Sequence, residues 1–187
     1  MNLDVTADIK DVTKMLKGLN TKTEAAASRA LNKTIASAKT QATRTISKET
    51  GIKPQKKVRE VLVVSKARRT KLVAVLEAKP RVFNLIEFVS PSRRNSRSFR
   101  KNSGVTAKAW GRSKLYPRTF VGRGRSSGKM LVFKRTSSKP SVPKEVKGPS
   151  VPRSFVQRKI QQAIVRRAEE QWLKNYQHEI NREISKI

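Results

Sequence analysis

The spacing of hydrophobic residues in the first fifty positions is typical of helices. From Asp8 to Leu19 apolar side chains recur three or four positions apart, which predicts a short helix with Gly18 as a stop signal. The positions that define this first pattern are Ile9, Val12, Leu16 and Leu19.

A longer helix is predicted from about Thr21 to Thr50. Glu24 suits its first turn, and Gly51 stands just past its end. The apolar stripe is narrow and rich in small side chains, so a partner helix can approach closely although little area is buried. That stripe consists of Leu31, Ile35, Ala38, Ala42 and Ile46.

The pattern changes to short, β-branched runs after a brief helix that starts near Pro54 and ends near Glu60. Runs at 61–64 and 71–79 predict a hairpin connected by residues 68–70, and 82–89 predicts a third strand. Further strands are predicted at 105–110, 118–121 and 130–134, the last two joined by the turn-rich loop 122–128.

Two segments lack any hydrophobic period. Ser90–Ser103 is a basic, serine-rich insertion, and residues 136–153 resemble a Pro-rich linker. From about Ser154 a helix is predicted to the chain end, with its apolar face formed by Phe155, Ile160, Ile164, Ala168, Trp172, Tyr176, Ile180 and Ile184.

The expected architecture is therefore α+β: long N-terminal and C-terminal helices flank a small, mostly antiparallel sheet with a basic loop insertion. We expect a single domain over 1–187, divided into a helical segment 1–52, a sheet region 53–135, the linker 136–153 and the helix 154–187.

Composition narrows the class of protein. Hydrophobic residues are 36% of the chain, so the core is modest and oligomerisation would help stability. There is no cysteine and one histidine, His178, which we expect to be a solvated helix residue; no metal site or cofactor is expected. No apolar run is long enough to span a membrane, and the N-terminus lacks the order of a signal peptide, which favours a reducing, cytosol-like compartment.

Charge gives the strongest functional signal. The chain has 44 Lys and Arg against 13 Asp and Glu, a net charge of +31, and no acidic residue lies between Glu87 and Glu145. Such a surface indicates a polyanionic partner: nucleic acid first, a membrane surface second, an acidic protein third. The residues expected to face DNA are Arg93, Arg94, Arg97, Arg100, Lys101, Arg112, Lys114, Arg123, Arg125 and Lys129.

The insertion Ser90–Ser103 has two interpretations. It is either a solvated loop, or a flexible arm that follows phosphates, with Phe99 as a stacking or anchoring group. The C-terminal apolar face favours a core or inter-subunit helix over a membrane-surface helix, because its polar side mixes both charge signs.

Enzyme chemistry is not expected. The loop from Gly122 to Lys129 lacks the first glycine of a phosphate-binding loop, because Arg123 stands five positions before Gly128, and Met130 replaces the Ser/Thr after Lys129. Carboxylates in the basic region are isolated, so neither acid–base catalysis nor a nuclease metal site is supported. No nucleophile signature surrounds any serine.

Several motifs in order resemble the minor tail protein Z family of long-tailed phages and prophages, the tail completion proteins. The first is Ala30-Leu31-Asn32-Lys33-Thr34, continuing to Gly51; the segments 58–60, 85–88, 105–111, 119–121 and 132–135 follow. The last is the Gly-Pro-Ser-Val-Pro signature before the final helix, expected to matter for assembly: Gly148, Pro149, Ser150, Val151 and Pro152, with Phe155. The resemblance covers about residues 20–160.

The resemblance implies a structural virion protein, assembled in the host cytoplasm and placed at the head-proximal end of the tail. It would complete the tail, join it to the head and hold the leading end of the double-stranded DNA in the lumen. Implied partners are the tail tube, tail terminator and connector proteins, within a homo-oligomeric ring of about six subunits by analogy with tail symmetry.

A free nucleic-acid-binding protein of ribosomal or nucleoid type is the alternative. It predicts salt-sensitive binding by the isolated monomer. The sequence shows no evident exposed aromatic pair of the kind that RNA-binding sheets use, which counts against it.

Overall fold

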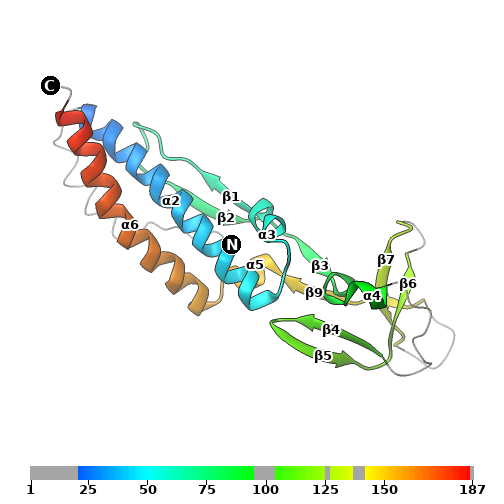
Figure 1. The fold of residues 1–187 in the computed structure, drawn as a ribbon. Helices are drawn as coiled ribbons and strands as arrows, with labels where there is room; N and C mark the ends of the chain where they lie inside the picture. The colour runs from blue at the N-terminus through cyan, green and yellow to red at the C-terminus, as the bar shows by residue number, and fades with distance from the viewer. Residues whose placement is uncertain (1–20, 95–103, 125–126, 137–141, 186–187) are drawn as a thin grey trace.

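Two long antiparallel helices lie side by side along one half of the molecule (Figure 1). The structure is a computed structural model that describes residues 21–94, 104–124, 127–136 and 142–185. Helix α2 spans Thr21–Thr50 and α6 spans Arg158–Ile184. Arg29 of α2 bonds Glu179 of α6 at one end, and Lys159 of α6 pairs with Glu49 at the other, which sets the antiparallel register.

Helix α2 has the bounds that its sequence predicts. Its narrow stripe is buried from Leu31 to Ile46, and three of the positions in it are fully enclosed alanine or isoleucine side chains. Gly51 ends the helix with φ +75°, and its N–H donates to the Ser47 carbonyl at 2.9 Å. A left-handed residue at this point is favourable only for glycine. The predicted helix 8–19 lies outside the described residues.

The C-terminal helix is divided where one continuous helix was expected. Helix α5 spans Val151–Phe155, and the extended backbone of Gln157 separates it from α6. The break lets Phe155 stay in the core while α6 turns to run along α2. Along α6 the apolar face is buried from Ile160 to Ala168 and only half-buried or exposed beyond it, so the expectation of a core helix is confirmed for its first half.

A hairpin covers the side of α2 away from α6 (Figure 1). Helix α3 (Gln55–Val61) leads into β1 (Leu62–Ser65), which pairs antiparallel with β2 (Val75–Ala78). The predicted strand 71–79 is shorter than expected. In the connection between β1 and β2, the Asn32 side chain of α2 binds both the N–H and the C=O of Ala67, so a helix side chain satisfies the backbone at that residue.

The predicted third strand at 82–89 is wrong beyond its third residue. Strand β3 (Val82–Asn84) gives way to the 3-10 helix η1 (Leu85–Phe88). The Asn84 side chain caps η1 by accepting from the Ile86 N–H at 2.9 Å. The helical turn buries Leu85, Ile86 and Phe88 together, which an alternating strand cannot do.

The segment expected as a linker is partly ordered structure. It contains β8 (Lys144–Glu145) and β9 (Lys147–Ser150), and α5 begins within it. Strand β9 pairs antiparallel with β3, so chain positions some sixty residues apart form one small sheet. Pro149 is tolerated because β9 has one strand neighbour among the described strands, so one edge needs no N–H donor.

The remaining strands make the other half of the molecule. Strand β4 (Val105–Ala109) forms a hairpin with β5 (Arg112–Tyr116), and β6 (Thr119–Arg123) pairs with β7 (Met130–Lys134), which also pairs with β8. Strand β5 was not predicted, because its residues are mostly polar and Arg112 to Leu115 are all exposed. The short helix α4 (Pro91–Arg94) precedes the undescribed part of the insertion.

The α+β class is confirmed, with several small antiparallel sheets in place of one. The hydrophobic core is continuous from Leu31 on α2 to Val132 on β7. The molecule is elongated: the helix pair occupies one end and the β4–β7 hairpins the other (Figure 1).

Candidate nucleic-acid interface

The β4–β7 half of the molecule carries basic side chains without acidic partners. No ion pair is formed by any described basic residue of 104–136, and this stretch contains no Asp or Glu. The exposed basic residues there are Lys108, Arg112, Lys114, Arg118, Arg123, Lys129, Lys134 and Arg135.

Four of the residues expected to face DNA lie in two exposed groups. Arg112 and Lys114 alternate on β5, opposite Ala109 and Ala107 of β4, so both project from the same side of this edge strand. Arg123 and Lys129 stand where β6 ends and just before β7 begins, at the loop end of that hairpin. The two hairpins therefore present separate patches of positive charge.

The predicted arm is only partly described. Arg94 is not a free cation: its Nε and Nη2 donate to the carbonyls of Val89 and Glu87, each at 2.9 Å, which ties α4 to η1. Of Arg93 only the backbone, in α4, is described. The other predicted DNA-facing residues, Arg97, Arg100, Lys101 and Arg125, lie outside the described residues, as does Phe99.

The helix pair, by contrast, balances part of its charge internally, since α2 and α6 together carry six acidic residues against twelve basic ones. The carboxylate of Glu179 is fully buried, with Arg29 Nε 2.6 Å from Oε2 and Lys33 Nζ 2.5 Å from Oε1. Arg29 also pairs with Glu183. Hydrogen bonding to Lys33 and then to Arg29, against the opposing effect of burial, lowers the pKa of Glu179 to about 2. In the sequence, the one signal for this cluster is the position of Glu179 within the apolar stripe of the C-terminal helix.

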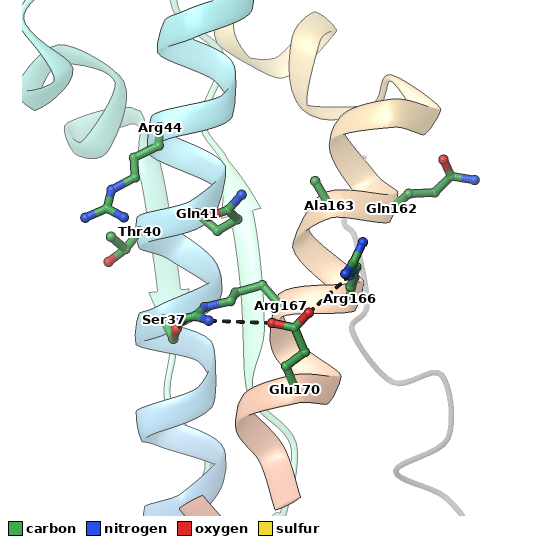
Figure 2. A pocket seen from close by; sticks show the side chains of 9 residues that line it. All are labelled: Ser37, Thr40, Gln41, Arg44, Gln162, Ala163, Arg166, Arg167 and Glu170. Carbon is green, nitrogen blue, oxygen red and sulfur yellow. Dashed lines mark hydrogen bonds and ion pairs between the residues drawn. The ribbon is translucent and has the colours of Figure 1, made fainter. Parts of the chain in front are cut away.

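A polar groove of about 690 Å³ lies between α2 and α6 (Figure 2). Glu170 binds both arginines that approach it from α6, with Arg166 Nε at 3.1 Å and Arg167 Nη1 at 3.5 Å. Arg167 also donates to the Ser37 hydroxyl of α2 at 3.2 Å. Among the described residues that line the groove, Glu170 is the only carboxylate and it is already paired, so these residues form no catalytic arrangement.

The Gly-Pro-Ser-Val-Pro segment forms a structural junction. A Cβ atom on Gly148 would lie 2.9 Å from the Phe88 ring and 3.1 Å from the Phe83 carbonyl oxygen, so only glycine fits. Val151 and Phe155 are buried, and the Pro152 carbonyl accepts from the Val156 N–H. These residues link β9 to α5 inside the protein. Their predicted part in assembly would therefore be indirect.

One sequence argument is corrected by the structure. Phe120 and Phe133 are cross-strand partners whose ring centroids lie 5.9 Å apart, and both are half-buried. Arg135 stands over the Phe120 ring at 5.7 Å. The protein thus does carry a partly exposed aromatic pair on a sheet, which the separation of its members in the sequence conceals.

Other kinds of site have no counterpart in the described part of the chain. Within it, no three His, Cys, Asp or Glu side chains gather in a way that could hold a metal ion. Its helices are too short or too polar to cross a bilayer. His178 is exposed on α6, as predicted.

Comparison with known proteins identifies a family. The family model described as prophage minor tail protein Z (GPZ) matches residues 8–187. Searches of the curated proteins and of the solved structures gave no significant match.

Proposed function

This chain belongs to the prophage minor tail protein Z family, and on that premise we propose that it completes the phage tail at its head-proximal end. As a family member it is a structural tail protein of the virion and not an enzyme, and its partners are other phage tail proteins. The proposal adds that it takes part in head–tail joining and holds the leading end of the DNA.

The observation that supports this is the separation of charge along the molecule. In the helix pair, several basic side chains face carboxylates, as in the Arg29–Glu179 and Lys159–Glu49 pairs. No described cation of residues 104–136 has such a partner. Bringing this end close to phosphates releases counterions, which favours binding to DNA without regard to sequence.

The elongated shape suits a ring subunit. We infer that the helix pair contacts neighbouring tail proteins while the hairpin end faces a lumen, in a ring of about six copies that follows tail symmetry. The tail tube, the terminator and the connector are the neighbours expected at this position. Like charges brought together around a lumen repel one another unless DNA is present.

Charge neutralisation tests the proposal in a phage that depends on the variant protein. In R112Q/K114Q/R123Q/K129Q we expect tails that assemble but fail to yield DNA-filled, joined particles. Infectious yield should fall at least about tenfold, which requires binding to DNA to weaken by only ~1.4 kcal/mol.

The matched control removes the same charge from exposed helical and hairpin positions elsewhere, in R44Q/K48Q/K56Q/K66Q. It should infect normally. An equal loss in both variants would mean that total charge, and not the β4–β7 surface, matters. Deletion of Ser92–Ser103 tests whether the basic insertion contributes to this function. If heads and tails still join and retain DNA normally, the insertion has no part in it.

The Phe120–Phe133 pair favours a second candidate, stacking on unpaired bases by a free nucleic-acid-binding protein. Membership of a tail protein family counts against a free protein. F120A/F133A separates the two. Loss of affinity for single strands alone would support stacking, whereas unchanged affinity for single and double strands would exclude it.

A further inference from the structure

The second half of α6 carries an apolar stripe on a side that does not face α2. Leu173 and Ile184 are 63% and 61% exposed, and Tyr176 and Ile180 between them are half-buried. Spacings of three and four residues put these four side chains on one flank of the helix. Over the same turns, Asn175 and Glu179 bond to α2, so the stripe is separate from the α2 contact.

Such a stripe is costly in water. Full burial of an aliphatic side chain of this size is worth about 1.5–3 kcal/mol, and two of the four are mostly exposed. Singly exposed apolar residues need no explanation, but a row along three turns of one helix indicates a covering element.

The chain itself supplies a segment at the right place. Because Arg29 contacts both Glu179 and Glu183, the start of α2 two turns earlier lies level with the end of α6. Figure 1 shows these two ends adjacent. Whatever precedes Thr21 therefore enters the molecule beside Ile184, at one end of the stripe.

That preceding segment has the matching pattern. Residues 8–19 lie outside the described residues, but their sequence has apolar positions at Ile9, Val12, Leu16 and Leu19, followed by a reversal signal at Gly18–Asn20. The segment 8–19 and the stripe 173–184 have equal numbers of residues, and a helix of either length spans roughly 18 Å. An isolated helix this short is marginal in water, so it needs a surface.

Charge agrees with the same pairing. If the segment folds back from Thr21 and runs parallel to α6, Leu19 comes level with the last turn of α6, and Asp8, eleven residues earlier, comes level with Lys174. Lys174 is exposed and forms no ion pair with the described residues. Within the segment Asp8 and Asp11 stand among Lys10, Lys14 and Lys17, so its charge is close to balanced in this strongly basic chain.

We propose that residues 8–19 dock as an amphipathic helix on the α6 stripe formed by Leu173, Tyr176, Ile180 and Ile184. The helix pair thereby becomes a three-helix unit, and the exposed apolar flank is covered by the protein's own N-terminal segment. This docking is independent of the proposed contact with DNA.

Introduced thiols test the docking without background, because the chain has no cysteine. In full-length L16C/I180C, a short bismaleimide is expected to cross-link within one chain, seen as a monomer of altered mobility with the mass of the linker added. The matched control is K14C/I180C, since Lys14 lies on the opposite side of the predicted helix. Its yield should be about tenfold lower, the ratio that ~1.4 kcal/mol of preference produces.

Equal yields in the two variants would overturn the proposal, because the segment would then present no fixed face to α6. So would the absence of any cross-link in L16C/I180C. Cross-links only between chains would identify a second copy as the occupant and overturn it as well. Deletion of residues 1–20 gives a second measurement: amide exchange over 172–184 should rise several-fold, and unchanged exchange would contradict docking.

Discussion

At the scale of single residues, Glu179 illustrates how this basic chain uses a carboxylate. Its side chain is fully buried, and Lys33 is the sole partner of Oε1 among the described residues. An unpaired buried charge would be expensive, so the two cations make the position tolerable. The same cations keep the folded-state pKa of Glu179 at about 2, below the ordinary value of 4.5.

The sign of the resulting pH dependence follows from linkage. Because folding lowers the pKa of Glu179, its contribution is present above the unfolded pKa and is lost as pH falls from about 4.5 toward about 2. We expect E179Q to lose roughly 1–3 kcal/mol of unfolding free energy at pH 7, with the deficit shrinking near pH 2.5. Urea unfolding of wild type and variant at both pH values measures this.

The control for that prediction is E170Q, because Glu170 is a part-exposed carboxylate that also holds two arginines. A surface pair of this kind is worth at most about 1 kcal/mol. If E179Q loses the same unfolding free energy at both pH values, the assigned pKa is contradicted. If E170Q loses as much unfolding free energy as E179Q, burial of the carboxylate is not the cause of the loss.

At the scale of elements, the motif Ala30–Thr34 explains how α2 organises its surroundings. Leu31 is buried in the core, and Lys33 binds Glu179 of α6. Asn32 holds the β1–β2 connection through Ala67, and the Thr34 hydroxyl accepts from Asn175 at 3.1 Å. Successive residues of one helical turn thus contact elements on different sides of α2, which gives the motif a structural reason.

Loss of the Asn32 side chain should release the β1–β2 connection. In N32A the Ala67 N–H and C=O lose partners at 2.8 Å and 3.0 Å, so we expect about 1–3 kcal/mol of destabilisation. Amide exchange over 66–74 should accelerate more than exchange in α6. The control is T40A, since the Thr40 hydroxyl bonds only its own helix at Ala36. Uniform acceleration along the chain in N32A would mean that Asn32 acts on global stability alone.

At the scale of the whole molecule, the feature that matters is the unequal distribution of charge. Helices α2 and α6 together carry twelve basic and six acidic residues, whereas 104–136 carries nine basic residues and none that are acidic. Attraction to a polyanion is therefore concentrated at one end of an elongated particle. Protein contacts meet less mutual repulsion at the other end, where carboxylates balance half of the basic residues of α2 and α6.

Salt dependence reports which end binds DNA. The slope of log affinity against log salt changes by about 0.9 for each phosphate that is no longer neutralised, so R112Q/K114Q should flatten the slope for duplex DNA by up to about 1.8. R44Q/K174Q, with the same net charge, should keep the wild-type slope. Filter binding between about 50 and 200 mM salt gives both slopes. Identical slopes in the two variants would place DNA away from β5.

Local signals in the sequence determined much of the fold. The bounds of α2, the stop at Gly51 and the α+β order follow from short-range spacing and from glycine's tolerance of positive φ. The overall charge, visible without any structure, already indicated a polyanion as partner.

Only tertiary structure decided the rest, because the groups that satisfy one another are far apart in the sequence. The Asn84 side chain accepts a hydrogen bond from the Val132 N–H, and β3 pairs with β9. Glu179 is buried because Arg29 of another helix pairs with its carboxylate. Likewise, Arg94 is held by local carbonyls while Arg112 and Lys114 remain exposed on an edge strand. Periodicity reports which side of an element is apolar, but burial and pairing depend on which distant element covers that side.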